Sequence, residues 1–340
     1  ALILFSWYDE WHEVMLETFA EDHGGLETSV TPYSSNQELY AKLKAGGTNS
    51  TDLVMPSNNM ITVLRDEGMI RPIDTDRLER WSLQQPVADR EPWRAFVQSD
   101  GEYWGVPFTR GYYTNYAHGE RVDDGTIPED LVGSWDVYFD DHDGKVGIKD
   151  YGRRNVSIVV WHLRGTDADI NEDPGSEVSW EEIEDGLVRM IENSTAIYSS
   201  NEDAVRLFAN GEIDVMNIWS GDVPEIGRHE GGEDARAYFP QEGTNGWFDS
   251  YCIPAEAPHP DLVHDYIDFT LTPENQARAV EIQGTFTVQP GVVDRVDGEA
   301  RELMRRLGDV DPTKLQPYSD DKDLQRRATE AWNNAKARAG

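Results

Sequence analysis

A tryptophan and a carboxylate stand close together in the segment Trp247-Phe248-Asp249-Ser250. In an extended segment alternate residues point to the same side, so Trp247 and Asp249 would share one face. The face of a tryptophan ring attracts an ammonium group by about 0.5–2 kcal/mol, and a carboxylate adds a charge-assisted hydrogen bond. The pair is therefore typical of a site for an organic cation. Core packing is the alternative role for each tryptophan.

Other aromatic and polar residues directly follow short apolar runs that predict buried strands. These runs alternate with amphipathic segments, which predicts an α/β fold whose mainly parallel sheet carries helices on both faces. Sheets of this kind bind ligands outside the carboxyl ends of their strands, so the residues there are candidates for binding. They are Trp7 after residues 2–5, Ser57, Asn58 and Asn59 after residues 53–55, Asp150 and Tyr151 after residues 145–149, and Trp219 after residues 213–218.

Helix starts are marked by side chains suited to cap free backbone N–H groups. Ser35 with Glu38, and Ser179 with Glu182, have the spacing of a capping box. Residues 11–23 place large apolar side chains four residues apart and end before two glycines, which predicts a helix.

The motifs of several enzyme classes are absent from the sequence. It contains no phosphate-binding glycine loop, no dinucleotide-binding glycine motif and no nucleophile elbow. Cys252 is the only cysteine, and its surroundings predict a small buried hydrophobe in a strand. His259 and His264 lie five residues apart, which is poor spacing for one helix face. We expect neither a cofactor nor a metal site.

The charge balance is strongly acidic. The 340 residues contain 65 Asp and Glu against 30 Lys and Arg, which gives a formal charge of −35. Nucleic-acid binding needs a basic face, and an anionic membrane surface repels such a chain, so we expect neither as a partner. Seven of the basic residues are Lys and 23 are Arg, a composition that resembles proteins of extreme halophiles and predicts a halophilic archaeal source. The alternative is an acidic surface that attracts cations.

The N-terminal residues carry no signal for export. Residues 1–5 are too few for the apolar region of a signal peptide and have no basic residues before them. No apolar run approaches the ~20 residues of a membrane-spanning helix. If the protein is exported, we expect its signal or lipid anchor to lie in a removed N-terminal segment.

Five stretches of the sequence, in order, resemble the spermidine/putrescine-binding proteins, the solute receptors of polyamine ABC importers. Each stretch is short, but together they span nearly the whole chain. They are YSSNQELYAKLK at 33–44, DLVMPS at 52–57, EGMI at 67–70, IWSG at 218–221 and WFDS at 247–250.

The resemblance implies a type II periplasmic-binding-protein fold with two α/β lobes. The first lobe would comprise residues 1–110 with 250–290, and the second residues 111–249 with 291–340. Such a protein binds its ligand in a cleft between the lobes and performs no reaction on it. The implied ligand is a polyamine such as putrescine or spermidine. A cell-surface location, a monomeric state and a membrane permease as partner are also implied.

Some residues match positions at which the family binds its ligand. By this resemblance, the tryptophans would hold the alkyl chain between their rings, and Asp249 would bind one ammonium group. The matching residues are Trp7, Ser57, Trp219, Trp247 and Asp249.

Other binding positions depart from the family's pattern. Glu10 and Asn59 stand where the family has tyrosines, and Thr285 stands where it has a late aromatic residue. Glu10 would supply a replacement carboxylate.

The second amine site of the family is altered most. Asp150 or Tyr151 would take the place of an aspartate, and Arg154 or Asn155 the place of a glutamate. An arginine repels a neighbouring ammonium group unless its side chain turns away, so we expect this end of the site to be rebuilt.

Three other functions stay open. The same receptor would bind another small amine, a zwitterion or an anion if Arg153, Arg154 or Arg110 faced the ligand. A carboxylate-dependent hydrolase is the enzymatic alternative, although chance carboxylate pairs abound in so acidic a chain. A sensor that passes its bound state to a membrane partner is the third.

Overall fold

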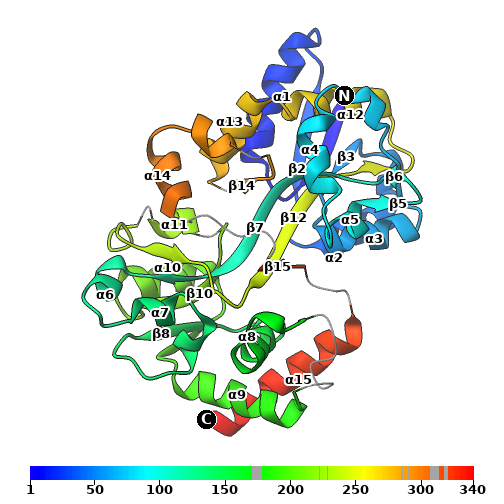
Figure 1. Cartoon of the computed structure of the whole chain (residues 1–340). Coiled ribbons are helices and arrows are strands. Elements are labelled where there is room, and N and C mark those ends of the chain that lie inside the picture. The colour runs from blue at the N-terminus through cyan, green and yellow to red at the C-terminus, as the bar shows by residue number, and fades with distance from the viewer. Residues whose placement is uncertain are drawn as a thin grey trace. The chain divides into compact units, whose positions relative to one another are not determined.

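The computed structural model describes residues 1–170, 178–221, 223–227, 229–284, 286–289, 291–306, 314–317 and 321–340 (Figure 1). Within these ranges, no helix is both long and apolar enough to cross a membrane. Helices and strands alternate along the chain, which confirms the predicted α/β class.

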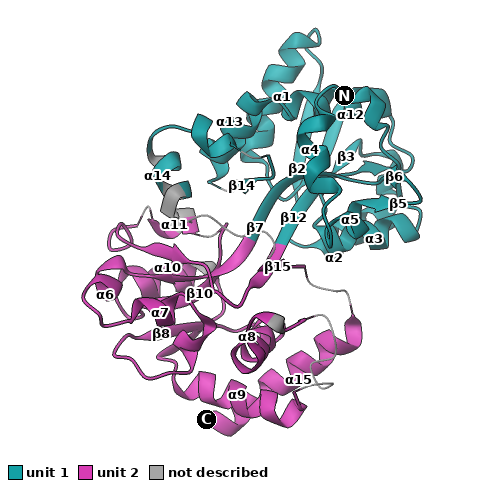
Figure 2. Cartoon of the chain, viewed as in Figure 1, with its two compact units in different colours: residues 1–111, 247–304 teal, residues 112–246, 305–340 magenta. Residues whose placement is uncertain are grey.

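The chain forms two compact units (Figure 2). Unit 1 comprises residues 1–111 and 247–304, and unit 2 comprises residues 112–246 and 305–340. Both units are therefore assembled from segments that lie far apart in the sequence.

Three elements carry the chain from one unit to the other. They are the strands β7 (Val106–Ala117) and β12 (Thr244–Tyr251) and the helix α14 (Gly298–Arg306). The assignment of residues 291–304 to unit 1 differs from the predicted division, which placed these residues in the second lobe. They group with unit 1 because the short 3-10 helix η6 (Val292–Arg295) packs against α13 (Pro273–Gln283).

Unit 1 is built on a parallel sheet with the strand order β2-β1-β3. Alternate residues of β1 are buried, and Leu2 and Leu4 share a core with Trp11 and Phe19 of α1, the helix that the sequence predicted. The strands and helices of unit 1 besides β7, β12, α13 and α14 are β1 (Leu2–Ser6), α1 (Glu10–Asp22), β2 (Thr28–Pro32), α2 (Asn36–Lys44), β3 (Leu53–Val54), α3 (Asn58–Asp66), β4 (Ile70–Arg71), α4 (Trp81–Ala88), α5 (Arg94–Val97), β5 (Gln98–Ser99), β6 (Glu102–Tyr103), β13 (Ile253–Pro254), α12 (Pro260–Thr270) and β14 (Phe286–Thr287).

A fully buried histidine makes the stability of unit 1 depend on pH. His12 stacks on Trp11 and lies 2.8 Å from the hydroxyl of Tyr266, and burial lowers its pKa to about 3. Below pH 6.5 the unfolded chain therefore binds a proton that the folded chain does not. We expect His12 to reduce the free energy of unfolding by about 1.4 kcal/mol per pH unit between pH 6.5 and 3.

Comparison of the wild type with His12→Gln isolates this effect, since both proteins share all other titrating groups. Urea unfolding at pH 7, 6 and 5 should show a steeper loss of stability in the wild type. His229→Gln, which alters an exposed histidine, should behave as the wild type. Parallel curves for the wild type and His12→Gln would contradict the prediction.

Unit 2 contains a mixed sheet in the order β15-β12-β7-β10-β8-β9, with β11 also paired to β7. The predicted parallel pairing holds between β10 and β8 and between β8 and β9. It fails at β7, which runs antiparallel to β10 and β11. The strands and helices of unit 2 are α6 (Gly119–Asp123), α7 (Glu129–Val132), β8 (Val146–Lys149), α8 (Gly152–Arg164), α9 (Trp180–Glu192), β9 (Ala196–Tyr198), α10 (Asn201–Ala209), β10 (Val215–Trp219), α11 (Val223–Gly227), β11 (Arg236–Tyr238), β15 (Leu315–Gln316) and α15 (Lys322–Ala339).

The core of unit 2 lies around α8, which is buried along most of its length. Trp161 of α8 stacks on Trp135 with ring centroids 6.0 Å apart, and α15 packs against both α8 and α9. The C-terminal helix is therefore an integral part of this unit.

The predicted local signals are confirmed. The Ser35 hydroxyl accepts the backbone N–H of Glu38 at the start of α2, and Ser179 with Glu182 forms a complete capping box at the start of α9. Cys252 is fully buried, and burial raises the pKa of its thiol, so it serves as a small hydrophobe.

Candidate functional site

The strand ends of unit 1 bring several predicted residues together. Trp7 and Tyr8 follow β1, and Ser57 follows β3 as the N-cap of α3. β1 and β3 are adjacent and parallel, so their carboxyl ends lie at the same edge of the sheet. β12 passes this edge, and Asp249 forms an antiparallel bridge with Ser57.

Asp249 is the centre of this group. Its side chain accepts hydrogen bonds from the hydroxyls of Ser57 at 2.7 Å, Tyr8 at 3.0 Å and Thr109 at 3.2 Å. Only 3% of the residue is exposed. Among the described residues, no Lys, Arg or His forms an ion pair with it. Asp249 is thus a buried carboxyl group whose hydrogen-bond donors are neutral hydroxyls.

The protonation of Asp249 reflects these surroundings. Burial raises its pKa to about 6, although the three hydroxyl donors pull the pKa the other way. The group is therefore ionised at neutral pH at a considerable desolvation cost. A bound ammonium group would offset that cost and favour the ionised form.

Aromatic residues also belong to this part of unit 1. The rings of Trp7 and Tyr33 are 4.7 Å apart, and the Tyr33 hydroxyl donates to the carbonyl oxygen of Met55 at 2.5 Å. Burial, followed by the nearby charge of Asp249, raises the pKa of Tyr33. The indole Nε1 of Trp7 is buried and makes no hydrogen bond within the described part of the chain. This part of unit 1 therefore contains aromatic rings as well as a buried carboxyl group, and its use as a site for an organic cation stays a prediction.

For the remaining predicted residues of unit 1, the structure gives the element and the exposure of the side chain. Trp247 precedes Asp249 by two residues on β12 and is partly exposed. Glu10 is an exposed residue in the first turn of α1, and Asn59 is partly buried in the first turn of α3. Thr285 lies outside the described residues.

In unit 2, an arginine covers the predicted aromatic site. Trp219 ends β10 and lies opposite Tyr113 of β7, and their rings meet edge to face with centroids 4.8 Å apart. The guanidinium carbon of Arg154 lies 3.6 Å from the Tyr113 ring centroid and 4.4 Å from that of Trp219. Trp219, which was expected to face a ligand cation, thus contacts a cation of the protein itself.

The predicted carboxylate of unit 2 is also engaged. Asp150 accepts hydrogen bonds from Nε1 of Trp332 at 2.5 Å and from Nζ of Lys336 at 2.9 Å, both on α15. Partial burial opposes the effect, but these bonds hold the pKa of Asp150 below its usual value. Tyr151 is 40% exposed as the N-cap of α8. Arg153 is buried and donates to the hydroxyl of Ser157 and the carbonyl of Ile170.

The sequence analysis missed Tyr8, Thr109 and Tyr113, which contact the predicted residues. Tyr8 follows the same strand as Trp7, so the rule that selected Trp7 would have selected it too. Thr109 and Tyr113 lie on β7, a strand that the sequence analysis did not predict.

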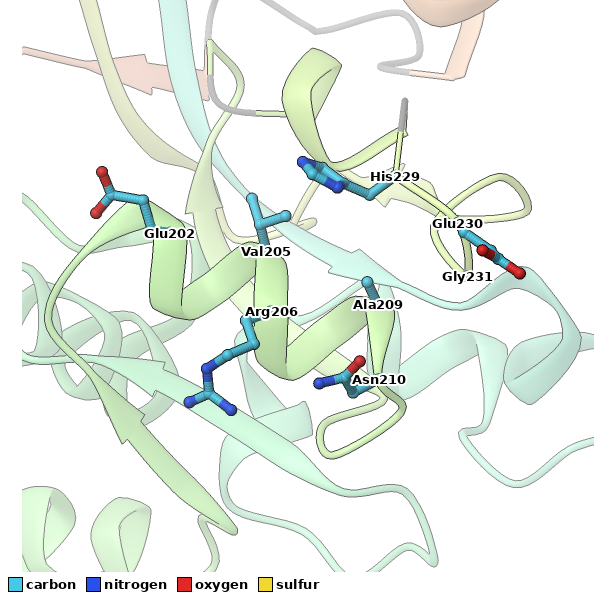
Figure 3. Close-up of a pocket in the computed structure, with 8 residues that line it drawn as sticks. All are labelled: Glu202, Val205, Arg206, Ala209, Asn210, His229, Glu230 and Gly231. Carbon is cyan, nitrogen blue, oxygen red and sulfur yellow. The ribbon is translucent and has the colours of Figure 1, made fainter.

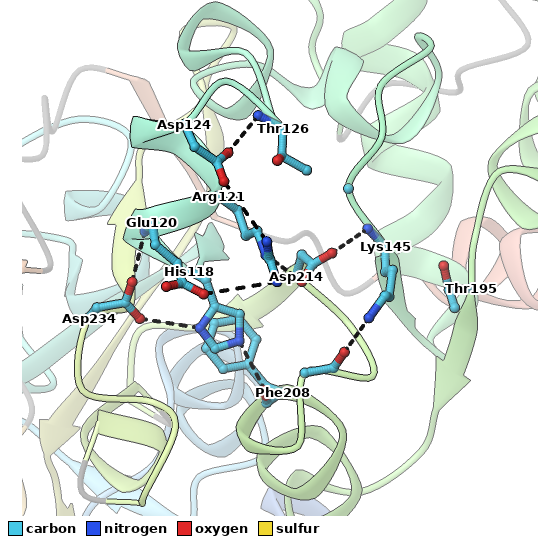
Figure 4. A network of polar contacts seen from close by, with 12 residues as sticks. His118, Glu120, Arg121, Asp124, Thr126, Lys145, Thr195, Phe208, Asp214 and Asp234 are labelled. Carbon is cyan, nitrogen blue, oxygen red and sulfur yellow. Dashed lines mark hydrogen bonds and ion pairs between the residues drawn. The ribbon is translucent and has the colours of Figure 1, made fainter.

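Unit 2 also contains a polar network at the opposite ends of its strands (Figure 4). Asp214, just before β10, accepts the backbone N–H of Lys145, just before β8, at 2.9 Å and pairs with Arg121 at 3.4 Å. His118 bridges Asp234 and the carbonyl oxygen of Phe208. These contacts hold the segments before β8 and β10 and after β7, so we assign them a structural role.

A surface pocket of unit 2 lies beside α10 (Figure 3). Its charged residues Glu202, Arg206 and Glu230 are exposed, and so is His229. Such a pocket keeps its charges in water and gives an ammonium group little binding energy. The buried carboxyl group of unit 1 is the stronger candidate.

Comparison with known proteins supports a binding role. Residues 14–305 match the family described as bacterial extracellular solute-binding protein. The spermidine/putrescine-binding periplasmic protein of Escherichia coli (strain K12) is 25% identical over 283 residues, which cover 83% of this chain and 76% of that protein. The putrescine/cadaverine-binding protein of Pseudomonas aeruginosa is 25% identical over 353 residues, covering 99% of this chain and 94% of that one.

Solved structures share the fold. A spermidine/putrescine ABC transporter substrate-binding protein from Streptococcus pneumoniae matches with a TM-score of 0.84 at 23% identity, covering 100% of this chain and 99% of that one. The maltodextrin-binding protein of L. casei matches with a TM-score of 0.72 at 12% identity, covering 99% and 93%. The predicted periplasmic-binding-protein fold is thus confirmed, and the chain belongs to the bacterial extracellular solute-binding protein family.

Proposed function

We propose that the protein is an extracellular receptor that binds a small organic amine and delivers it to an ABC importer. The observation that carries the proposal is Asp249, a buried carboxyl group held by three hydroxyl donors. A buried carboxylate is costly until a cation neutralises it, and an ammonium group supplies both charge and N–H donors. The named ligands of the relatives, putrescine, spermidine and cadaverine, support the same ligand class.

The names of the relatives support a proposed partner and location. They are named as periplasmic binding proteins or as substrate-binding proteins of ABC transporters. We infer that this chain acts outside the cytoplasmic membrane, as a monomer, and that its partner is a membrane permease. Binding would leave the ligand chemically unchanged, unlike turnover by the hydrolase considered above.

Three of the predicted residues of unit 1 have a proposed role. Asp249 would bind the ammonium group, and the ring of Trp7 would cover the adjoining alkyl carbons. Ser57, through its hydroxyl, would keep the carboxylate oriented. Because Asp150 is engaged by α15, the proposal rests on Asp249 and takes a small amine as the ligand class.

Amine binding should weaken in mild acid. Only ionised Asp249 can pair with an ammonium group, and its pKa lies at about 6. We expect the affinity to be constant from pH 7 to 8 and to fall roughly tenfold per pH unit well below pH 6. Calorimetric titrations between pH 8 and pH 4.5 would measure this. An affinity that stays constant down to pH 4.5 would contradict the role of Asp249.

The proposal is tested with four-carbon amines in concentrated KCl. Isothermal titration calorimetry is carried out with 1,4-diaminobutane, 4-amino-1-butanol, 4-aminobutanoate and 1-aminobutane. We expect at least one to bind with a Kd of about 10 μM or tighter, which corresponds to roughly 7 kcal/mol. Mass spectrometry should recover it unchanged after prolonged incubation. Absence of binding by all four, or conversion of the amine, would refute the proposal.

A further inference from the structure

Tyr33 connects the ends of the three strands that form the parallel sheet of unit 1. It directly follows β2, and its backbone N–H donates to the carbonyl oxygen of Ser6, the last residue of β1, at 3.1 Å. Its hydroxyl donates to the carbonyl oxygen of Met55, which directly follows β3, at 2.5 Å. Only 4% of Tyr33 is exposed. The residue is therefore held at its backbone and at the far end of its side chain.

The ring of Tyr33 packs against the indole of Trp7. The two ring centroids are 4.7 Å apart and the ring planes are inclined by 56°, a tilted geometry that favours attraction between aromatic rings. Among the described residues, Tyr33 is the only aromatic residue in ring contact with Trp7, and none accepts a hydrogen bond from the indole N–H. The orientation of the indole therefore depends on packing, and Tyr33 is its aromatic neighbour.

Tyr33 is also linked to the carboxyl group of Asp249. After burial, the charge of Asp249 is the next cause of the raised pKa of Tyr33, because a nearby negative charge disfavours the phenolate. Met55, which accepts the hydroxyl of Tyr33, lies two residues before Ser57, whose own hydroxyl donates to Asp249. Tyr33 thus contacts both the indole of Trp7 and the strand end that leads to Ser57.

We infer that Tyr33 is a positioning residue that holds the indole of Trp7 for contact with the alkyl carbons of the ligand. Tyr33 acts through Trp7, while the ammonium group is bound by Asp249. The inference rests on the proposed function, which assigns these roles to Trp7 and Asp249. It goes further because it names the residue on which recognition of the apolar part of the ligand depends.

The test compares 1-aminobutane with methylamine, which carry the same ammonium group and differ by three methylene groups. Burial of one methylene group raises an affinity about fourfold. For the wild type we therefore expect about tenfold or tighter binding of 1-aminobutane, measured by calorimetry, with NMR titration for the weaker ligand. Equal affinities, or no binding of 1-aminobutane, would overturn the inference without any variant.

The variant Tyr33→Leu removes the ring that packs against Trp7. We expect the affinity ratio of the two amines to fall to about threefold or less, while the affinity for methylamine stays within about twofold of the wild type. Tyr33→Phe keeps the ring and should therefore keep a larger ratio than Tyr33→Leu. An unchanged ratio in folded Tyr33→Leu would overturn the inference.

A double-mutant cycle tests whether Tyr33 acts through the indole. Trp7→Leu should lower the ratio as Tyr33→Leu does. Combining the two substitutions should lower the ratio no further, because both remove the same contact with the ligand. Independent, additive effects would show that Tyr33 does not act through Trp7.

Tyr266→Leu is the control for loss of stability. Tyr266 is a fully buried tyrosine of the same unit, and its hydroxyl lies 2.8 Å from Nδ1 of His12. This substitution should lower the melting temperature but leave the ratio unchanged, which separates positioning from destabilisation. Circular dichroism and thermal melting establish that each variant is folded. If Tyr33→Leu does not fold, Tyr33→Met provides the same test, because its flexible side chain fills irregular space without an aromatic ring.

Failure of the inference and failure of the proposed function give different results. If Trp7→Leu lowers the ratio and Tyr33→Leu does not, the receptor role stands and the positioning role falls. If the wild type binds none of the four-carbon amines named above, the receptor role itself fails.

Discussion

Asp249→Asn is expected to weaken amine binding by roughly 100-fold or more, which corresponds to about 3 kcal/mol. Asparagine has nearly the same shape, and its amide oxygen can still accept hydrogen bonds at one of the two oxygen positions, either from Ser57 or from Tyr8 and Thr109. It cannot neutralise an ammonium group, so the ligand would carry an unpaired charge into a water-poor site. Isothermal titration calorimetry with the tightest-binding four-carbon amine measures the loss.

Two controls separate loss of the charge from disturbance of the fold. Asp66→Asn removes a carboxylate whose side chain is 65% exposed, in the same unit, and should leave the affinity within about twofold. Ser57→Ala removes one hydroxyl donor and keeps the charge, so it should weaken binding by about tenfold or less. Equal affinities of Asp249→Asn and the wild type would show that the amine binds elsewhere.

Trp332→Ala is expected to destabilise unit 2 by about 3–5 kcal/mol. Trp332 is 2% exposed in the core of this unit, and its indole N–H donates to Asp150. A Cβ atom at Gly152 would lie 2.9 Å from the Cβ of Trp332, so α15 packs closely on the start of α8. The substitution leaves a large cavity at this contact and removes one of the two donors to Asp150. Denaturant unfolding should show the loss.

Trp332→Phe distinguishes the two contributions. It keeps an aromatic ring in the core but loses the indole donor, so we expect a smaller loss of about 1–2 kcal/mol. Trp180→Ala, at a partly exposed tryptophan on α9, should cost less than Trp332→Ala. A change below about 1 kcal/mol for Trp332→Ala would show that α15 is not an integral part of unit 2.

Local rules predicted the positions of the main candidates in unit 1. Trp7 and Ser57 follow adjacent parallel strands, so the general behaviour of parallel sheets brings their segments together. Asp249 was selected from its spacing to Trp247 and from the resemblance to polyamine receptors. The donors to its carboxyl group could not be predicted from the sequence, because one of them, Thr109, lies on a strand 140 residues away.

The roles predicted for unit 2 depended on long-range contacts that the sequence does not encode locally. No neighbour of Asp150 in the sequence indicates a partner for its side chain. In the structure it binds two residues of a helix about 180 residues further on. Arg154 was expected to turn away from an ammonium group or to face an anion. Its place over Tyr113 and Trp219 depends on the antiparallel pairing of β7 with β10, whereas a mainly parallel sheet was predicted.

The formal net charge of −35 gives little information about the ligand. In molar salt, charges farther apart than about 3 Å are largely screened, so a diffuse acidic surface cannot select an amine. Asp249 differs from an exposed carboxylate because it is buried and held by neutral hydroxyls. The halophilic source inferred from the excess of Arg over Lys stays a prediction.

Proton release on binding tests whether Asp249 is the partner of the ligand's ammonium group. With a pKa of about 6, Asp249 is about half protonated at pH 6 in the free protein and ionised in the complex. Calorimetry in buffers of different ionisation enthalpy should therefore detect release of about half a proton per ligand at pH 6 and close to none at pH 8. Release of no proton at pH 6 by a protein that binds the amine tightly would show that Asp249 does not pair with it.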